Sequence, residues 1–290
     1  MTTSGGPQAI AGGPPPVPPV PRRRSRTARR ATAIAVASTV LVLGGLTWIV
    51  VHAPNWPEVQ QDFLNGPIFW SSLPGLIAAF WLNVKLFLIA EALILPLGLL
   101  IAVLRGLPGP VFTPVRGLAT AYVDIFRAVP GLVVIYVLGF GVPGLGIPGV
   151  PNEPFFWAVV ALTLIYSAYV SEVYRAGIES VHPSQDAAAR SLGLSRTQSM
   201  RHVILPQAVR RVIPPLLNDF IGLQKDTVLV SFIGVVEIFR TAQIKQAATF
   251  NFTPIIGVAL VFIVVTIPLA RFTDRLVARD KARSSAGVAR

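Results

Sequence analysis

The residues of this chain that could do chemistry are a few charged side chains set within long apolar segments. Asp124 and Arg127 are three residues apart, and Glu172 and Arg175 repeat that spacing, so each pair could share one face of a helix. A charge at the centre of a bilayer costs ~2.5–3.5 kcal/mol on insertion scales, so such groups face protein or water. Each pair can therefore neutralise itself inside the protein or line a polar path, and the spacing leaves both interpretations open.

A second group of polar residues lies further along the chain. Lys225 and Asp226 are adjacent and so do not share a helix face. Beside a broken helix they could line a pathway or meet the charged ends of an amino acid. Lys85 and Glu91 are expected to face the interior of a helix bundle, where Asn83 could form a hydrogen bond.

The sequence lacks the patterns that would indicate enzyme chemistry. It contains no G-x-x-x-x-G-K-[ST] phosphate loop, no H-E-x-x-H motif, no G-x-S-x-G turn and no cysteine. Disulfides, thiolate metal sites and a cysteine nucleophile are therefore excluded. We expect no metal site and no cofactor on this chain, so the energy for moving a solute uphill would come from a gradient or a partner.

One polar loop, residues 182–195, has the signals of a short helix of about two turns. Asp186 lies in its first turn, where the helix dipole favours an anion. The expected capping positions, including a capping box that starts the next helix, are Ser184, Gly193, Ser195 and Gln198. Such a helix is either a docking surface for a partner or a turn that joins two longer elements.

The elements that position these residues are long apolar runs. The chain is 53% hydrophobic and only 13% charged, whereas a typical soluble domain is about 25% charged. About 20 residues at 1.5 Å each cross a ~30 Å hydrocarbon core, which predicts an all-α integral membrane protein with about six spans. The runs are 31–51, 77–104, 117–139, 156–177, 203–224 and 254–275. Pro214 and Pro215 should kink or break the fifth, and 141–154 is expected to be a loop.

The distribution of basic residues predicts the orientation. Residues 1–30 are rich in Pro, Gly and Arg and are expected to be a disordered cytoplasmic tail before an uncleaved first span at 31–51. With both termini inside, 20 of the 25 Lys and Arg residues lie in cytoplasmic segments, including a tail at 277–290. The net charge of +12 therefore reflects membrane topology, and we expect lipid rather than nucleic acid around the chain.

The loop resembles a known element. Ala187-Ala188-Ala189-x-x-x-Gly193, nine residues, and then Val203-x-Leu205-Pro206 resemble the EAA loop of bacterial ABC-transporter permeases. Ala187 replaces the usual Glu of that pattern, and Asp186 is the neighbouring candidate for its charge. The resemblance implies that a coupling loop, 182–206, docks in a groove of an ATPase subunit. The implied coupling residues are Gln185, Asp186, Ala187, Ala188, Ala189, Arg190, Leu192, Gly193, Leu205 and Pro206.

Three further segments resemble the polar amino acid uptake branch, which includes histidine, glutamine and glutamate permeases. Segment 168–178 resembles A-Y-x-x-E-x-x-R-x-x-I, 122–130 contains an F-R-G-T-P-like element, and 218–229 resembles N-x-x-x-x-x-x-K-D-T-S-L. The likeness covers about 76–276 but not the first 50 residues. The sequence departs from the branch pattern at Ala128, Val129 and Val228. The implied substrate pathway comprises Arg127, Glu172, Asn218, Lys225, Asp226 and Thr227.

This resemblance implies a type I ABC permease bundle in the bacterial plasma membrane, working as a homodimer or heterodimer. Two such subunits would dock two ATPases, which carry the ATP and Mg²⁺, and an extracytoplasmic solute-binding protein would deliver a polar or charged amino acid. Two other function classes remain open. One is a carrier or channel driven by a gradient, and the other is a membrane scaffold without transport.

Overall fold

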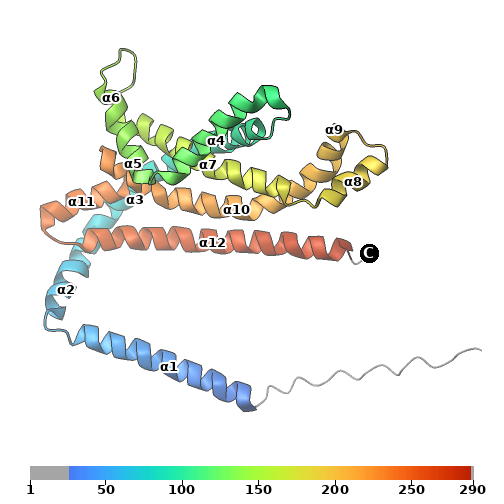
Figure 1. The fold of residues 1–290 in the computed structure, drawn as a ribbon. Coiled ribbons are helices and arrows are strands. Elements are labelled where there is room, and N and C mark those ends of the chain that lie inside the picture. The colour runs from blue at the N-terminus through green and yellow to red at the C-terminus, as the bar shows by residue number, and fades with distance from the viewer. Residues whose placement is uncertain (1–25, 289–290) are drawn as a thin grey trace, which may run out of the picture. The chain divides into compact units, whose positions relative to one another are not determined.

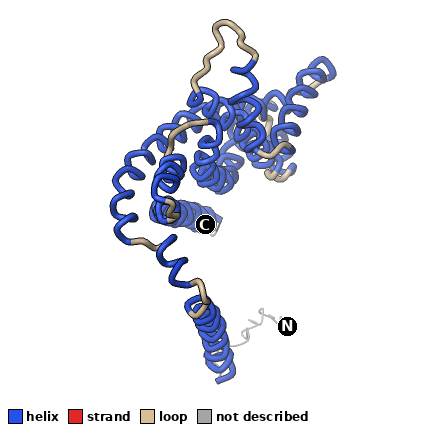
Figure 2. Tube along the Cα trace, turned by 90° about the vertical axis from the view of Figure 1, so that its left-hand side faces the viewer, coloured by secondary structure: helices blue, strands red, loops and turns tan. Residues whose placement is uncertain are grey.

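The computed structural model describes residues 26–288, and every regular element in that range is a helix (Figures 1 and 2). The chain forms two compact units, Met1–Pro57 and Glu58–Arg290. The first contains α1 (Arg26–Val51), in which residues 30–51 are all exposed within the chain. This helix contains the expected span 31–51. Residues 26–30, expected to be disordered, are helical, whereas the rest of that tail lies outside the described residues.

The remaining helices follow in chain order, and most of them belong to the second unit. The α-helices are α2 (Trp56–Phe63), α3 (Gly66–Arg105), α4 (Thr113–Ala128), α5 (Gly131–Tyr136), α6 (Val142–Gly144), α7 (Pro154–Glu179), α8 (Pro183–Ser191), α9 (Arg196–Ser199), α10 (Leu205–Asp226), α11 (Ile238–Thr249) and α12 (Thr253–Val288). The 3₁₀-helices are η1 (Pro110–Phe112) and η4 (Thr227–Ile233). The π-helices are η2 (Val137–Gly141) and η3 (Met200–Ile204).

The core of the second unit lies where α3, α7 and α10 pack together. α7 runs alongside α10, as Figure 1 shows. Leu86, Ile94, Leu162 and Leu223 are at most 1% exposed in this core. The outer faces of the same helices carry many exposed apolar side chains, as expected for a surface that meets lipid.

Within residues 26–288, four helices are long and apolar enough to cross a membrane, or up to six if each of two bent helix pairs is one span. This confirms the expected fold class and the number of about six spans. The run 117–139 was wrongly expected to be one continuous helix, because α4 and α5 meet at a bend of 106°. Pro130 accounts for the bend, since it restricts Val129 to an extended backbone (φ −82°, ψ 131°).

Pro214 and Pro215 were expected to kink or break the fifth run, and the break is wrong, because α10 continues through both to Asp226. Close packing against α7 supports this helix. A Cβ built on Gly177 of α7 would lie 2.0 Å from Val212 Cγ1 of α10, so only a glycine allows this approach. The bend of that span falls later, with an angle of 50° between 196–233 and α11.

Two boundaries also differ from the expectation. The segment 277–290, expected to be a tail, continues α12 as a helix to Val288. The loop expected at 141–154 begins with the end of η2 and the short helix α6, so the irregular part starts at Leu145. Neither difference moves the segments that carry the candidate site.

Candidate functional site

The coupling loop contains the short helix expected from its sequence, α8, with one shifted cap. His182, not Ser184, is the N-cap, because the imidazole of His182 accepts a hydrogen bond from the Ser184 backbone N–H. Gly193 has φ +87° just after the helix, as expected for its left-handed cap. The capping box of Ser195 and Gln198 at the start of α9 is also confirmed.

Asp186 is half-buried, and its role as a replacement for the charge that the Ala187 position lacks stays a prediction. The carboxylate of Asp186 accepts a hydrogen bond of 2.5 Å from the hydroxyl of Ser199, which is fully buried. This bond fastens α8 to the start of the following helix. The implied coupling residues that are exposed carry no carboxylate, and they are Gln185, Ala187, Ala188, Arg190, Leu192, Gly193, Leu205 and Pro206.

Ala189 is the inward-facing alanine of α8 and is 4% exposed. Leu192, at the C-terminal end of the same helix, is 85% exposed. A large apolar side chain so exposed beside small alanines suits insertion into a complementary groove. α8 therefore packs against the protein through Ala189 and presents Leu192 at its surface.

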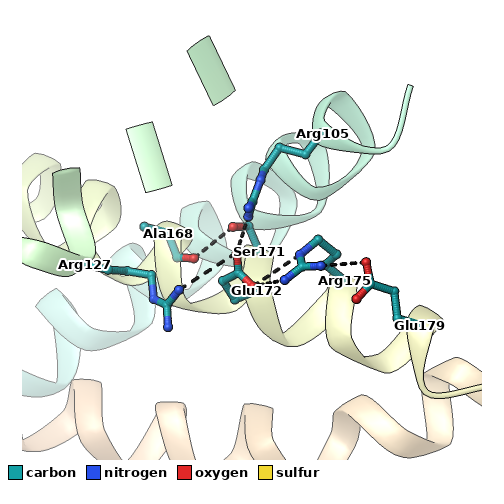
Figure 3. Close-up of polar contacts among 7 residues, drawn as sticks. All are labelled: Arg105, Arg127, Ala168, Ser171, Glu172, Arg175 and Glu179. Carbon is teal, nitrogen blue, oxygen red and sulfur yellow. Dashed lines mark hydrogen bonds and ion pairs between the residues drawn. The ribbon is translucent and has the colours of Figure 1, made fainter. Parts of the chain in front are cut away.

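A second cluster surrounds Glu172 at the junction of three helices (Figure 3). Arg105 of α3 forms a hydrogen-bonded ion pair with one carboxylate oxygen of Glu172. Arg175 binds the other oxygen at 2.8 Å and reaches Glu179 at 2.6 Å. The expected pair Glu172–Arg175 is thus confirmed, but Arg105, which is 67 residues away in sequence, was not anticipated as its partner.

Arg127 contacts the same carboxylate more loosely. Its guanidinium lies 3.9 Å from Glu172, and 5.8 Å from the centroid of the Tyr169 ring. The expected pair Asp124–Arg127 is wrong, because no ion pair between them occurs in the part of the chain that is described. The i,i+3 spacing permits the pair, but Glu172 of α7 lies nearer to Arg127.

A third polar cluster lies between α3, η4 and α11. The carboxylate of Glu237, which is 0% exposed, accepts hydrogen bonds from the backbone N–H groups of Phe239 and Arg240 and from the Asn83 amide. The Asn83 amide also donates to Thr227 at 3.1 Å, so the expectation that Asn83 forms a hydrogen bond in the interior is confirmed. Glu237 itself was missed, because an isolated Glu after an apolar run gives no local signal of a helix cap.

The other expected pathway residues do not gather at one point. Asn218 and Lys225 are exposed, whereas Asp226 accepts a hydrogen bond of 2.7 Å from the Tyr166 hydroxyl. Thr227 is fully buried, with its hydroxyl engaged. Their role in a pathway stays a prediction.

The polar residues of α3 and α10 also differ from the expectation in part. Lys85 was expected to face the bundle interior and is instead exposed within this chain. α3 presents its opposite face, with Asn83 and Leu86, to the core. The partly buried Glu91 interacts electrostatically with Asp219, which sequence reasoning had not selected. One carboxylate oxygen of Asp219 is buried and has no hydrogen-bond partner among residues 26–288.

Together these features define a membrane protein: a helical bundle with two bent helix pairs, charge clusters between its helices and a short surface helix, α8. The comparison with known families agrees. Residues 94–281 match the family "Binding-protein-dependent transport system inner membrane component", and the chain belongs to this family. It is therefore a multi-pass inner-membrane protein of a transport system and not itself an enzyme.

Curated relatives are identical to this chain at about a third of the aligned positions. The probable glutamine ABC transporter permease protein GlnM of Bacillus subtilis (strain 168) is 36% identical over 208 residues, covering 71% of this chain and 94% of the relative. The glutamate/aspartate import permease protein GltK of Escherichia coli O157:H7 is 37% identical over 182 residues, covering 60% of this chain and 80% of the relative.

Solved structures show the same fold. The chain is similar to a chain of "an amino acid ABC transporter with histidines", with a TM-score of 0.64, 34% identity and coverage of 75% of this chain and 98% of the other. A chain of the MetNI methionine ABC transporter in an inward-facing conformation matches with a TM-score of 0.59 and 17% identity, covering 74% of this chain and 99% of the other. This second likeness concerns the fold alone.

Proposed function

We propose that this chain is the permease subunit of an ATP-driven importer that moves a polar or charged amino acid across a bacterial plasma membrane. The observation that carries the proposal is α8, a short exposed helix fastened by Asp186 to the start of the next helix. A helix of this kind can pass the movement of a docked partner to the helix that follows it. The amino acid class rests on the names of the relatives, which include glutamine and glutamate/aspartate permeases.

ATP and Mg²⁺ are proposed to bind a separate ATPase subunit, since this sequence has no phosphate loop. The partner docks on the coupling loop 182–206, which lies in the cytoplasm together with both termini. The bias of the Lys and Arg residues supports this orientation. An extracytoplasmic solute-binding protein delivers the amino acid to the opposite face, in line with the family description.

Two permease subunits, either identical or merely similar, enclose the proposed path. The substrate passes charged and polar residues of α4, α7, α10 and η4. These are Arg127, Glu172, Asn218, Lys225, Asp226 and Thr227. Support comes from their position within apolar spans, where polar side chains are costly unless they serve a path or a packing contact.

The test is reconstitution of the chain with an ATPase and a binding protein in proteoliposomes. Uptake of labelled glutamine, glutamate or arginine should require ATP, and Gly193→Asp should separate ATP hydrolysis from uptake while membrane insertion survives. Gly193 needs φ +87° and an added Cβ meets open space, so the change strains only the cap of α8.

Gly109→Asp is the matched control, because Gly109 has φ +90° and equally open surroundings but lies outside α8. It should leave the ratio of transported amino acid to hydrolysed ATP unchanged. Normal transport by the Gly193 variant would refute the docking role. Uptake driven by an ion gradient without the ATPase would favour a carrier instead.

A further inference from the structure

The cavity beside the Glu172 cluster has more positive than negative charge around it. Its volume is about 480 Å³, and it opens between α4, α7 and α10. The cavity is lined by Arg127, Glu172, Val173, Ala176, Gly177, Ser180, Arg211 and Pro215. Arg105, Arg127 and Arg175 contact the carboxylates of Glu172 and Glu179, and Arg211 is a fourth arginine in the lining of the cavity. The arginines around the cavity therefore outnumber the carboxylates by two.

Three of these arginines are already engaged. Arg105 is 12% exposed and bound to Glu172, and Arg175 bridges Glu172 and Glu179. Arg211 donates to the backbone oxygen of Ser180 and, at 3.1 Å, to its hydroxyl. Each of these guanidinium groups is held in place by protein oxygen atoms.

Arg127 differs from them in both contact and exposure. Its only ion pair in the described chain is the 3.9 Å contact with Glu172, whose carboxylate is shared with Arg105 and Arg175. The side chain is 45% exposed and lines the cavity. Figure 3 shows it approaching Glu172 from the side opposite to Arg175. The ring of Tyr169 at 5.8 Å limits where the guanidinium can move.

We propose that this cavity binds the α-carboxylate of the transported amino acid, with the Arg127 guanidinium as its ligand. A guanidinium presents a planar fork of N–H donors that matches a carboxylate with two parallel hydrogen bonds. The inference rests on the proposed function and adds a chemical basis for its substrate class. Ala176, Gly177 and Ser180 place the site toward the α8 end of α7, which is the exit side in the proposed orientation.

The experiment uses the permease and its ATPase in lipid nanodiscs, without binding protein, and measures equilibrium binding of labelled glutamine, glutamate and arginine. Wild-type protein should bind at least one of them and should bind its carboxamide analogue, which lacks the α-carboxylate charge, much more weakly. Arg127→Gln should weaken binding of the amino acid by about 10-fold or more but leave binding of the carboxamide unchanged, since only a charged carboxylate gains from the fork. The affinity of Arg127→Lys for the amino acid should lie between the affinities of the wild type and of Arg127→Gln.

Arg116→Gln is the matched control. Arg116 lies on the same helix, but its guanidinium donates to the Leu107 and Gly109 backbone oxygens and to Thr113, away from the cavity. Unchanged affinity in Arg127→Gln, equal binding of acid and carboxamide by the wild type, or no binding of any of the three amino acids would overturn the inference. A melting temperature for each variant separates loss of binding from loss of folding.

The outcome can be distinguished from a failure of the proposed function. ATP-dependent uptake by the wild type together with an unchanged KM in Arg127→Gln would defeat the carboxylate site alone. Absence of ATP-dependent uptake in the wild type would defeat the proposed function itself. The expected pattern is a raised KM in Arg127→Gln, with ATP-dependent uptake retained at saturating substrate.

Discussion

Replacing Glu172 by Gln should destabilise the protein because it leaves the largely buried Arg105 without its counter-ion. Arg105 is 12% exposed and Glu172 18% exposed, so this pair is largely removed from water. Removing one partner of a buried pair costs ~3–5 kcal/mol, and the residual exposure places the loss near the lower end, about 3 kcal/mol. Arg175 is 39% exposed and adds only about 0–1 kcal/mol. At ~2–4 °C per kcal/mol for a chain of this size, the melting temperature should fall by roughly 6–12 °C.

The assay is thermal melting of purified protein in detergent. The readout is the loss of the monodisperse elution peak as the temperature rises. Glu179→Gln is the control, because Glu179 is 60% exposed and its pair with Arg175 should contribute less than about 1 kcal/mol. Arg105→Met combined with Glu172→Gln should recover most of the loss, since no uncompensated charge then stays buried. A melting temperature for Glu172→Gln within about 2 °C of wild type would refute the reasoning.

Two further predictions concern packing and the buried polar cluster. Gly177→Ala places a Cβ 2.0 Å from Val212 Cγ1 and should cost about 1–3 kcal/mol, and adding Val212→Ala should restore stability. No rescue by the second change would show that the helices meet elsewhere. Asn83→Ala removes the amide that joins Glu237 and Thr227 and should cost about 1–3 kcal/mol, measured by the same melting assay. A melting temperature for Asn83→Ala equal to that of the wild type would mean that the hydrogen bonds of Asn83 to Glu237 and Thr227 do not stabilise the protein.

Most of the long helices, the Gly193 cap and the Ser195–Gln198 capping box were predictable from sequence because their causes are local. The apolar runs set the spans, and the spacing from Ser195 to Gln198 fixed the start of α9. The contacts between helices were not predictable, since nothing near Arg105 indicates a partner 67 residues away. Local rules also failed where packing outweighed them: α10 continues through Pro214 and Pro215 against α7.

The break before α11 sharpens the argument for Arg127. In many transporters the N-terminus of a broken helix points its dipole at an anionic group of the substrate. Here the Glu237 carboxylate occupies that position, accepting hydrogen bonds from Phe239 N at 3.0 Å and Arg240 N at 2.8 Å. A helix end already neutralised by its own buried carboxylate has no donors left for a substrate. A carboxylate crossing this bundle therefore finds no free donor at the N-terminus of α11, and Arg127 is a loosely held guanidinium that lines a cavity large enough to receive it.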